Sequence, residues 1–207
     1  MKVELLCITP DAEKLIESAG RTSYLSFNKQ GKDTEKTFVR MLIKNGHLSV
    51  LEHAYATFRI SGVSRAFTHQ LVRHRLCSFT QQSQRYVNQN NFSYIEPDKI
   101  KSNIDAHVMF TRFIDEAQKV YSELQKMGIK NEDARFVLPN AVESQIVMTS
   151  NFREWRHIIV VRGSRGAQWE IRRMAIEVLK IFKKLVPTVF EDFEIDEKNI
   201  LVKAKKR

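Results

Sequence analysis

The chain of 207 residues contains only two cysteines, seven glycines and four prolines. Two cysteines cannot build a disulfide framework, and their scarcity indicates a reducing compartment. The few glycines and prolines form no linker, and no stretch approaches the roughly 20 apolar residues that a membrane-spanning helix requires. An unbroken apolar run of the kind found in secretory signals is also missing at the start, so we expect a cytoplasmic protein.

Glycine-rich nucleotide-binding motifs are missing as well. The sequence contains neither G-x-x-x-x-G-K-[ST] nor a G-x-G-x-x-G after a predicted strand, and it lacks the C-x-x-C and H-E-x-x-H patterns of metal or redox sites. If the protein binds a dinucleotide, it therefore does so without a Rossmann turn. Guanidinium groups would then hold the phosphates, because their planar fork grips two phosphate oxygens at once.

Positive charge is the feature that the sequence has in excess. Lys and Arg number 34 against 24 Asp and Glu, which gives a net charge of +10. This surplus indicates a polyanionic partner such as nucleic acid, a nucleotide, a phosphorylated cofactor or acidic lipid, without choosing among them. Apolar residues at 43% and charged residues at 28% are ordinary for a soluble globular protein.

The pattern of apolar residues and caps predicts a helix-rich α+β protein. Strands are expected at 2–8, 55–60 and 141–149, helices at 10–20, 33–46, 64–74, 98–126, 131–139, 151–161 and 168–185, and a polar loop at 76–93. The first of these helices would begin at Pro10 behind a Thr9 cap, and the second would bury Phe38, Met41 and Leu42. We expect one domain over 1–207, with a basic tail at about 200–207 whose last residues, 203–207, form a frayed end.

The densest polar segment runs from Gln70 to Tyr86 and contains three adjacent residues with cationic character, Arg73, His74 and Arg75. Consecutive helical residues point about 100° apart, so on a helix these three would spread around the circumference. At the frayed end of a helix entering a loop, they can instead face two or three separate anionic groups. A solvated basic helix end is the alternative interpretation.

A second basic and aromatic patch spans 151–157 and is followed by a further arginine. Asn151 can cap a helix here, which leaves backbone N–H groups nearby for an anion. A structural cap with Trp155 in the core explains the same residues. His47 and His53 have five residues between them, which is not a strong metal pattern and is more typical of structural histidines.

Together, Arg73-His74-Arg75, seven further residues and Ser83 match the R-H-R-x7-S signature of flavin-dependent thymidylate synthases, and the chain resembles that family. Further blocks resemble the family in its order, namely 49–53, 134–139, 151–157 and 162–170. The resemblance extends over roughly 15–190.

The resemblance implies a homotetramer of the family's fold, with a small, mostly antiparallel sheet and active sites at subunit interfaces. The implied ligands are FAD, dUMP, methylenetetrahydrofolate and NADPH, with no metal, nucleic acid or membrane. In the implied reaction a methylene group is transferred to uracil C5 and reduced by a flavin hydride, which gives dTMP. The family uses no cysteine nucleophile, so we expect Cys77 to be a buried structural residue.

Residue by residue, the resemblance assigns two ligand sets. The dUMP set is Gln70, Arg73, Gln81, Ser83, Gln84, Arg85, Arg135 from another subunit, and Arg162. The FAD set is Ser23, Ser49, Arg73, His74, Arg75, Gln81, Asn151, Arg153 and His157, with His47 as a weaker candidate. The catalytic residues are Arg162, which would polarise the pyrimidine, and Ser83, which would donate or accept a hydrogen bond rather than attack.

The sequence departs from the family at two positions. Gln81 stands where some members have Glu, which puts a general-base role in doubt. Gly166 stands where many have His, so a flavin contact is missing or is replaced by Arg165. Two rival hypotheses remain: a basic nucleic-acid-binding module, suggested by the net charge and the C-terminal Lys203-Ala-Lys-Lys-Arg207, and an inactive family member.

Overall fold

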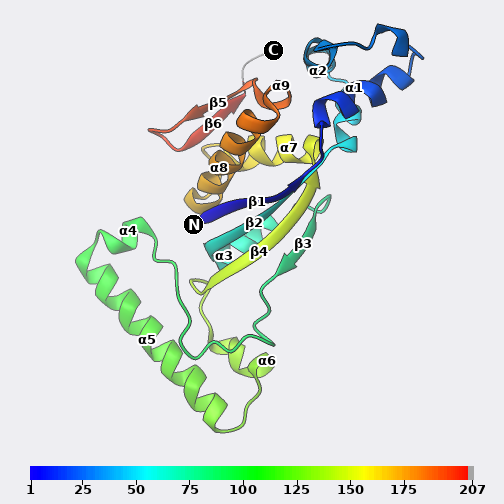
Figure 1. The fold of residues 1–207 in the computed structure, drawn as a ribbon. Helices are drawn as coiled ribbons and strands as arrows, with labels where there is room; N and C mark the ends of the chain where they lie inside the picture. Colours follow the sequence, from blue (N-terminus) through cyan, green and yellow to red (C-terminus); the bar gives the residue numbers. More distant parts are fainter. Residues whose placement is uncertain (205–207) are drawn as a thin grey trace. The chain divides into compact units, whose positions relative to one another are not determined.

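The computed structural model describes residues 1–204 and is rich in helices, with six short to medium strands in that range. In chain order (Figure 1) the elements are β1 Lys2–Ile8, α1 Ala12–Thr22, α2 Thr34–Lys44, β2 Tyr55–Ser64, α3 Arg65–Leu71, β3 Ser78–Gln81, α4 Asp98–Lys101, α5 Ile104–Lys126, α6 Asn131–Ala134, β4 Glu143–Asn151, α7 Phe152–Arg162, α8 Trp169–Leu185, α9 Pro187–Phe190, β5 Phe193–Asp196 and β6 Leu201–Ala204. The expected α+β class is confirmed.

The strands form two sheets. One has the order β1-β2-β4-β3, and the other is the β5-β6 hairpin. Strands β2 and β4 run antiparallel, because the Phe152 N–H donates to Ala54 O while the Thr57 and Thr149 hydroxyl oxygens lie 2.9 Å apart. The hairpin is also antiparallel, so the expectation of a mostly antiparallel arrangement is confirmed.

The chain divides into two compact units that both draw on several stretches of sequence. The first comprises 1, 61–70 and 80–146, and the second comprises 2–60, 71–79 and the residues from 147 onward. Strands β2, β3 and β4 contribute residues to both. The single domain over 1–207 stays a prediction.

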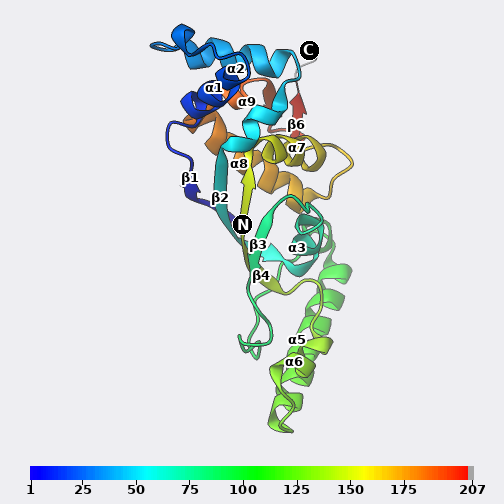
Figure 2. The same ribbon diagram turned by 90° about the vertical axis from the view of Figure 1, so that its right-hand side faces the viewer.

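The second unit is built around helix α8. Gln168 caps this helix by accepting hydrogen bonds from the N–H groups of Glu170 and Ile171. Its buried apolar residues recur at helical spacing and end at Phe182, whose ring packs edge-on against Phe58 and Trp155. Helix α7 and the β5-β6 hairpin both pack against α8, and Figure 1 shows α8 in orange between them. Helices α1 and α2 pack side by side, as Figure 2 shows.

The first unit has its own smaller core beneath the long helix α5. Asn103 begins α5 by accepting a hydrogen bond from Ala106 N–H at 3.0 Å. Ile114 and Ala117 of this helix pack with Phe92 and Val142. Helix α6 lies alongside the same helix in Figure 1, and the two are in contact. Within residues 1–204, no helix has both the length and the apolar character needed to cross a bilayer.

Several of the expected elements differ from the structure. The helix expected at 98–126 is divided into α4 and α5, and the α-helix expected at 131–139 ends at Ala134. The loop expected at 76–93 contains β3. The first helix begins at Ala12 rather than Pro10, because Asp11 takes a left-handed conformation and the Thr9 hydroxyl is hydrogen-bonded to the backbone of Tyr55 instead. In α2 the exposed Met41 is not part of the buried side, which consists of Val39, Leu42 and Ile43 beside a half-buried Phe38.

The expectation of a frayed end is wrong for residues 203 and 204, which belong to strand β6. Val202 N–H donates to Gly163 O at 2.9 Å, and both Leu201 and Val202 are buried. A Cβ atom on Gly163 would lie 2.6 Å from Val202 Cβ, so only glycine permits this approach. The strand therefore supports the chain directly after Arg162. The remainder of the expected tail, 205–207, lies outside the described residues.

Candidate active site

Helix α7 carries Arg153, His157 and Arg162, with Asn151 as its N-cap. The Asn151 side chain accepts a hydrogen bond from Glu154 N–H at 2.9 Å, which confirms the expected cap. Trp155 is fully buried, and its indole N–H donates to Ala56 O at 3.1 Å. This anchoring fixes the helix so that Glu154, His157 and Arg162 belong to the side that meets His74.

His74 lies at the centre of a hydrogen-bonded row. Arg162 Nε donates to His74 Nε2 at 2.9 Å, and His74 Nδ1 lies 3.2 Å from Glu154 Oε1. The His157 ring stands edge-on to the His74 ring at a centroid distance of 5.9 Å. His74 is 6% exposed, whereas Arg73 and Arg75 on either side are exposed. The three adjacent residues therefore point in different directions, as expected for a helix end that enters a loop.

The environment keeps the His74 ring neutral. Burial, with the positive charge of Arg162 and the proximity of His157, lowers the pKa of His74 to about 4. Burial also raises the pKa of Glu154. Burial and the nearby charge of Arg73 lower the pKa of Arg162 from its usual value, although an arginine remains protonated at neutral pH.

His74, Glu154 and His157 also resemble a metal-ligand set, because their donor atoms all lie within 4.8 Å of one another. Both nitrogens of His74 are already used, since Nε2 accepts from Arg162 and Nδ1 faces Glu154. A cation would also have to lie beside the Arg162 guanidinium. The arrangement thus favours a hydrogen-bonded neutral histidine over a metal ligand.

The remaining candidates of the second unit lie on segments that pack around α7. The turn Leu48–His53, which carries Ser49, contacts both α7 and α1, and Ser23 follows the last residue of α1. Ser23, Ser49 and the weaker candidate His47 are all exposed. Arg153 forms an exposed ion pair with Glu52 at 2.5 Å.

The first unit holds the glutamine-rich half of the signature. Gln81 Nε2 donates to Thr68 Oγ1 at 2.8 Å and to Ser144 Oγ at 3.2 Å, and both hydroxyl residues are buried. Thr68 Oγ1 in turn donates to Arg65 O. Because the Thr68 hydroxyl donates its proton to Arg65 O, it accepts a hydrogen bond from the Gln81 amide nitrogen. The Gln81 amide therefore turns its nitrogen toward the two hydroxyls and presents Oε1 as a hydrogen-bond acceptor.

A second group in the same unit gathers around Glu132. Arg85 Nη2 lies 3.1 Å from Glu132 Oε2, and Arg135 Nε donates to the Glu132 carbonyl at 3.0 Å. Burial, together with the charge of Arg135, lowers the pKa of Arg65. A cavity of about 410 Å³ adjoins this group and is lined by Arg85, Tyr86, Gln125, Gly128, Ile129, Lys130, Asn131 and Glu132.

The other expected residues of the first unit are half-buried. Ser83 Oγ accepts a hydrogen bond from Arg85 N–H at 3.2 Å, which is a local turn contact. Gln70 and Gln84 are also half-buried. Gly166, by contrast, is exposed, and a Cβ added there would meet nothing within 4 Å, so steric crowding does not explain the missing histidine.

Sequence reasoning missed five residues that contact the candidates: Arg65, Thr68, Glu132, Ser144 and Glu154. Glu154 could have been found, because it precedes His157 by three residues on one expected helix and so shares its side. Thr68 precedes Gln70 by two residues on a short helix, and that spacing carries no such signal.

We expect the buried neutral His74 to make stability depend on pH. An unfolded chain protonates this ring near its ordinary pKa of 6.5, whereas the folded chain does so only near 4. Proton binding therefore favours the unfolded chain as the pH falls through this interval. Over the interval, the free energy of unfolding of the wild type should drop by about 3 kcal/mol more than that of a His74→Gln variant. Urea unfolding of both proteins at pH 7, 5.5 and 4.5 measures the difference. A difference that is constant with pH would show that His74 is not buried neutral.

The sequence matches a known family model over most of its length. The model described as "Thymidylate synthase complementing protein" matches residues 4–188. A protein of Mycolicibacterium gilvum named flavin-dependent thymidylate synthase is 43% identical in an alignment 198 positions long that covers 87% of this chain and 79% of that protein. A protein of the same name from Geobacter sulfurreducens is 41% identical in an alignment 200 positions long that covers 93% of this chain and 86% of its own length.

Solved structures give the same fold. Thymidylate synthase X from Helicobacter pylori, crystallised with FAD and dUMP, aligns with a TM-score of 0.78 at 22% identity over 93% of this chain and 98% of its own. A second structure of the Helicobacter pylori protein with FAD and dUMP gives the same TM-score at 23% identity. The similarity confirms the expected fold.

Proposed function

The chain belongs to the thymidylate synthase complementing protein family, and from this membership we propose that it converts dUMP to dTMP as a flavin-dependent thymidylate synthase. The methylene carbon of methylenetetrahydrofolate replaces the hydrogen on uracil C5, which leaves as a proton. A hydride then reduces the new group to methyl, and NADPH is the final source of both electrons. Tetrahydrofolate and NADP⁺ are the other products, and the cytoplasm is the proposed location.

The donor set of the second unit fits a cofactor that carries phosphates. Arg73 and Arg162 are close enough for one charge to lower the pKa of the other, and the carboxylate near them, Glu154, faces His74. Guanidinium groups are suited to phosphate oxygens. The proposed FAD residues are Ser23, Ser49, Arg73, His74, Arg75, Gln81, Asn151, Arg153 and His157. FAD supplies the hydride when bound.

For dUMP, the proposed residues are Gln70, Arg73, Gln81, Ser83, Gln84, Arg85, Arg135 and Arg162. Arg85 would contact the substrate in place of its ion pair with Glu132, and Arg135 would reach the nucleotide from another subunit. Ser83 would hydrogen-bond the substrate. Arg162 would face a pyrimidine carbonyl, where negative charge grows as hydride arrives, so a fixed cation stabilises the transition state more than the ground state.

The observation that best supports these roles is the hydrogen bond from Arg162 to His74. It joins the proposed catalytic cation to the central histidine of the R-H-R signature, although 88 positions separate them. The test is direct. Purified protein should be yellow, and it should form dTMP from dUMP, methylenetetrahydrofolate and NADPH. Colourless protein that stays inactive after FAD is added would overturn the proposal.

Cys77 gives a prediction that separates this chemistry from a cysteine-dependent route. Cys77 is half-buried rather than fully buried as expected; its thiol donates to Ser150 Oγ at 3.3 Å, and this partial burial raises its pKa to about 11. A thiol with this pKa is almost entirely protonated at pH 7 and is a poor nucleophile. We therefore expect Cys77→Ala to keep kcat for dTMP formation within about threefold. A loss of about 10³-fold or more in folded protein would indicate a nucleophilic cysteine.

We propose that the enzyme is a homotetramer, and an apolar side of α5 supports a contact with a second copy. Met109, Phe113 and Val120 lie on one side of this helix at 65%, 57% and 38% exposure. Contiguous apolar side chains at a surface are typical of interaction sites. Phe113→Asp should lower the mass measured by light scattering, while Lys119→Ser on another side of the helix should not. An unchanged mass for Phe113→Asp would exclude this side from the interface.

The nucleic-acid-binding alternative has no support among the relatives found. The net charge that suggested it is explained equally well by a set of phosphate-bearing substrates. Salt-dependent DNA binding without dUMP binding would revive it.

A further inference from the structure

Glu154 is a buried acid for which the proposed reaction has no use. It is 8% exposed, and its backbone N–H is held by the Asn151 side chain, so its position on α7 is fixed. Its carboxylate oxygen Oε1 faces His74 Nδ1 at 3.2 Å rather than a lysine or arginine side chain. A buried carboxylate costs free energy unless it is hydrogen-bonded, so the contact with His74 accounts for its presence.

The row of three side chains has only one consistent direction of hydrogen bonds. A guanidinium Nε–H can donate but not accept, so His74 Nε2 must be the unprotonated, accepting nitrogen. A neutral imidazole then carries its proton on Nδ1, where Glu154 Oε1 accepts it. The direction is thus Arg162 to His74 to Glu154, and the acid determines which ring nitrogen is free for the arginine.

We propose that Glu154 is a positioning residue that orients Arg162 through His74. By keeping the ring proton on Nδ1, Glu154 leaves Nε2 free to accept the Arg162 Nε–H and so fixes the plane of the guanidinium. This inference rests on the proposed function, in which Arg162 faces the pyrimidine. Without an acceptor at Nδ1 the ring can carry its proton on Nε2, where it would oppose the Arg162 N–H and turn the guanidinium away.

Variants of the holoenzyme separate this role from a merely structural one. Glu154→Gln keeps a carbonyl oxygen that can accept from Nδ1–H, whereas Glu154→Leu keeps the bulk and removes the acceptor. We expect Glu154→Leu to lower kcat by about 10- to 100-fold with the KM for dUMP changed less than about twofold, and Glu154→Gln to stay within about threefold of wild type. The matched control is Glu17→Gln, another buried acid of this unit, which contacts Arg21 and Thr34. It should reduce stability and leave kcat unchanged.

A measurement on the unmodified protein keeps the inference testable if Glu154→Leu does not fold. The ¹⁵N shifts of His74 at pH 7 should show the tautomer with the proton on Nδ1. The Nε2–H tautomer in wild type would overturn the inference, as would full kcat in folded Glu154→Leu or an equal loss in Glu154→Gln. If wild-type protein forms no dTMP at all, the proposed function fails instead, and the two results are therefore distinguishable.

Discussion

Replacing Arg162 with Gln is expected to lower kcat for dTMP formation by about 10²- to 10³-fold at saturating substrates. Hydride delivery to the pyrimidine builds negative charge on its carbonyl oxygens, and the Arg162 guanidinium is held in place by its bond to His74. The neutral amide cannot compensate for that charge. Arg162→Lys keeps the positive charge but replaces the planar fork by a point charge, so we expect a smaller loss of about 10- to 100-fold.

Arg40→Gln is the matched control, because it removes the same charge elsewhere in this unit. Arg40 is exposed on α2 and pairs with Glu191 at 2.6 Å, a surface contact worth little. The kcat of Arg40→Gln should equal that of wild type. Circular dichroism and flavin content establish that each variant is folded and loaded. Arg162→Gln with kcat within about threefold of wild type would contradict the proposed role.

The signature could be read from the sequence because its residues are close neighbours in the chain. The contacts that orient these side chains could not be predicted from the sequence. His74 and Arg162 are 88 positions apart, and Gln81 and Ser144 are 63 apart. Nothing in either local sequence specifies such a pairing, which arises from the strands and helices that carry the residues. The sequence therefore identified candidate residues such as His74, but not Glu154, the acid that sets the tautomer of His74.

Prediction of the secondary structure from the sequence has the same limit, because long-range contacts decide some of the segments. Asn151 caps α7 as expected, because capping depends on residues within one turn. Strands β5 and β6 were both missed; they pair with each other as a short hairpin, and β6 is also bonded to Gly163, 39 positions before Val202. Strand β3 has only four residues, three of them polar, and is a strand because β4 lies beside it. Tertiary contacts decide such segments, and local propensity does not.

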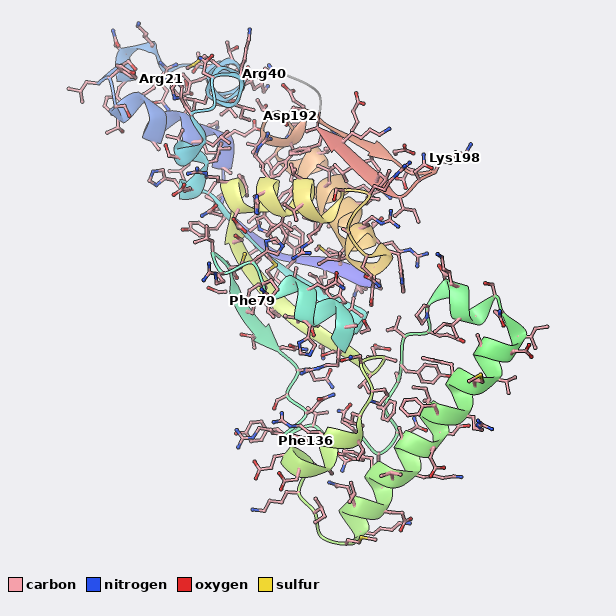
Figure 3. All side chains as sticks on the ribbon, turned by 180° about the vertical axis from the view of Figure 1, so that it is seen from behind. Arg21, Arg40, Phe79, Phe136, Asp192 and Lys198 are labelled. Atoms are coloured by element: carbon pink, nitrogen blue, oxygen red, sulfur yellow. The ribbon has the colours of Figure 1, made fainter. Side chains whose placement is uncertain are left out.

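Removing the Asp192 carboxylate is expected to lower the free energy of unfolding by about 3 kcal/mol. Asp192 lies between α9 and β5 (Figure 3), and its carboxylate accepts hydrogen bonds from both Nη atoms of Arg156, at 2.8 and 2.6 Å. Arg156 is 6% exposed, donates also to Val189 O, and lies over the Phe193 ring at 4.7 Å. Asp192→Ala leaves this guanidinium buried with its main counter-charge gone. Urea unfolding at pH 7 measures the loss.

Glu191, next to Asp192, is a control that separates the effect of burial from the effect of ion-pair geometry on the free energy of unfolding. Glu191 pairs with Arg40 at 2.6 Å, but both of these side chains are about half exposed, so Glu191→Ala should cost no more than about 1 kcal/mol. The double change Arg156→Met with Asp192→Ala should recover part of the loss, because no unpaired charge then remains buried. Equal losses for Asp192→Ala and Glu191→Ala would mean that Arg156 reaches water. Since Arg156 lies on α7 six residues before Arg162, the same buried pair also holds the helix that carries the proposed catalytic cation.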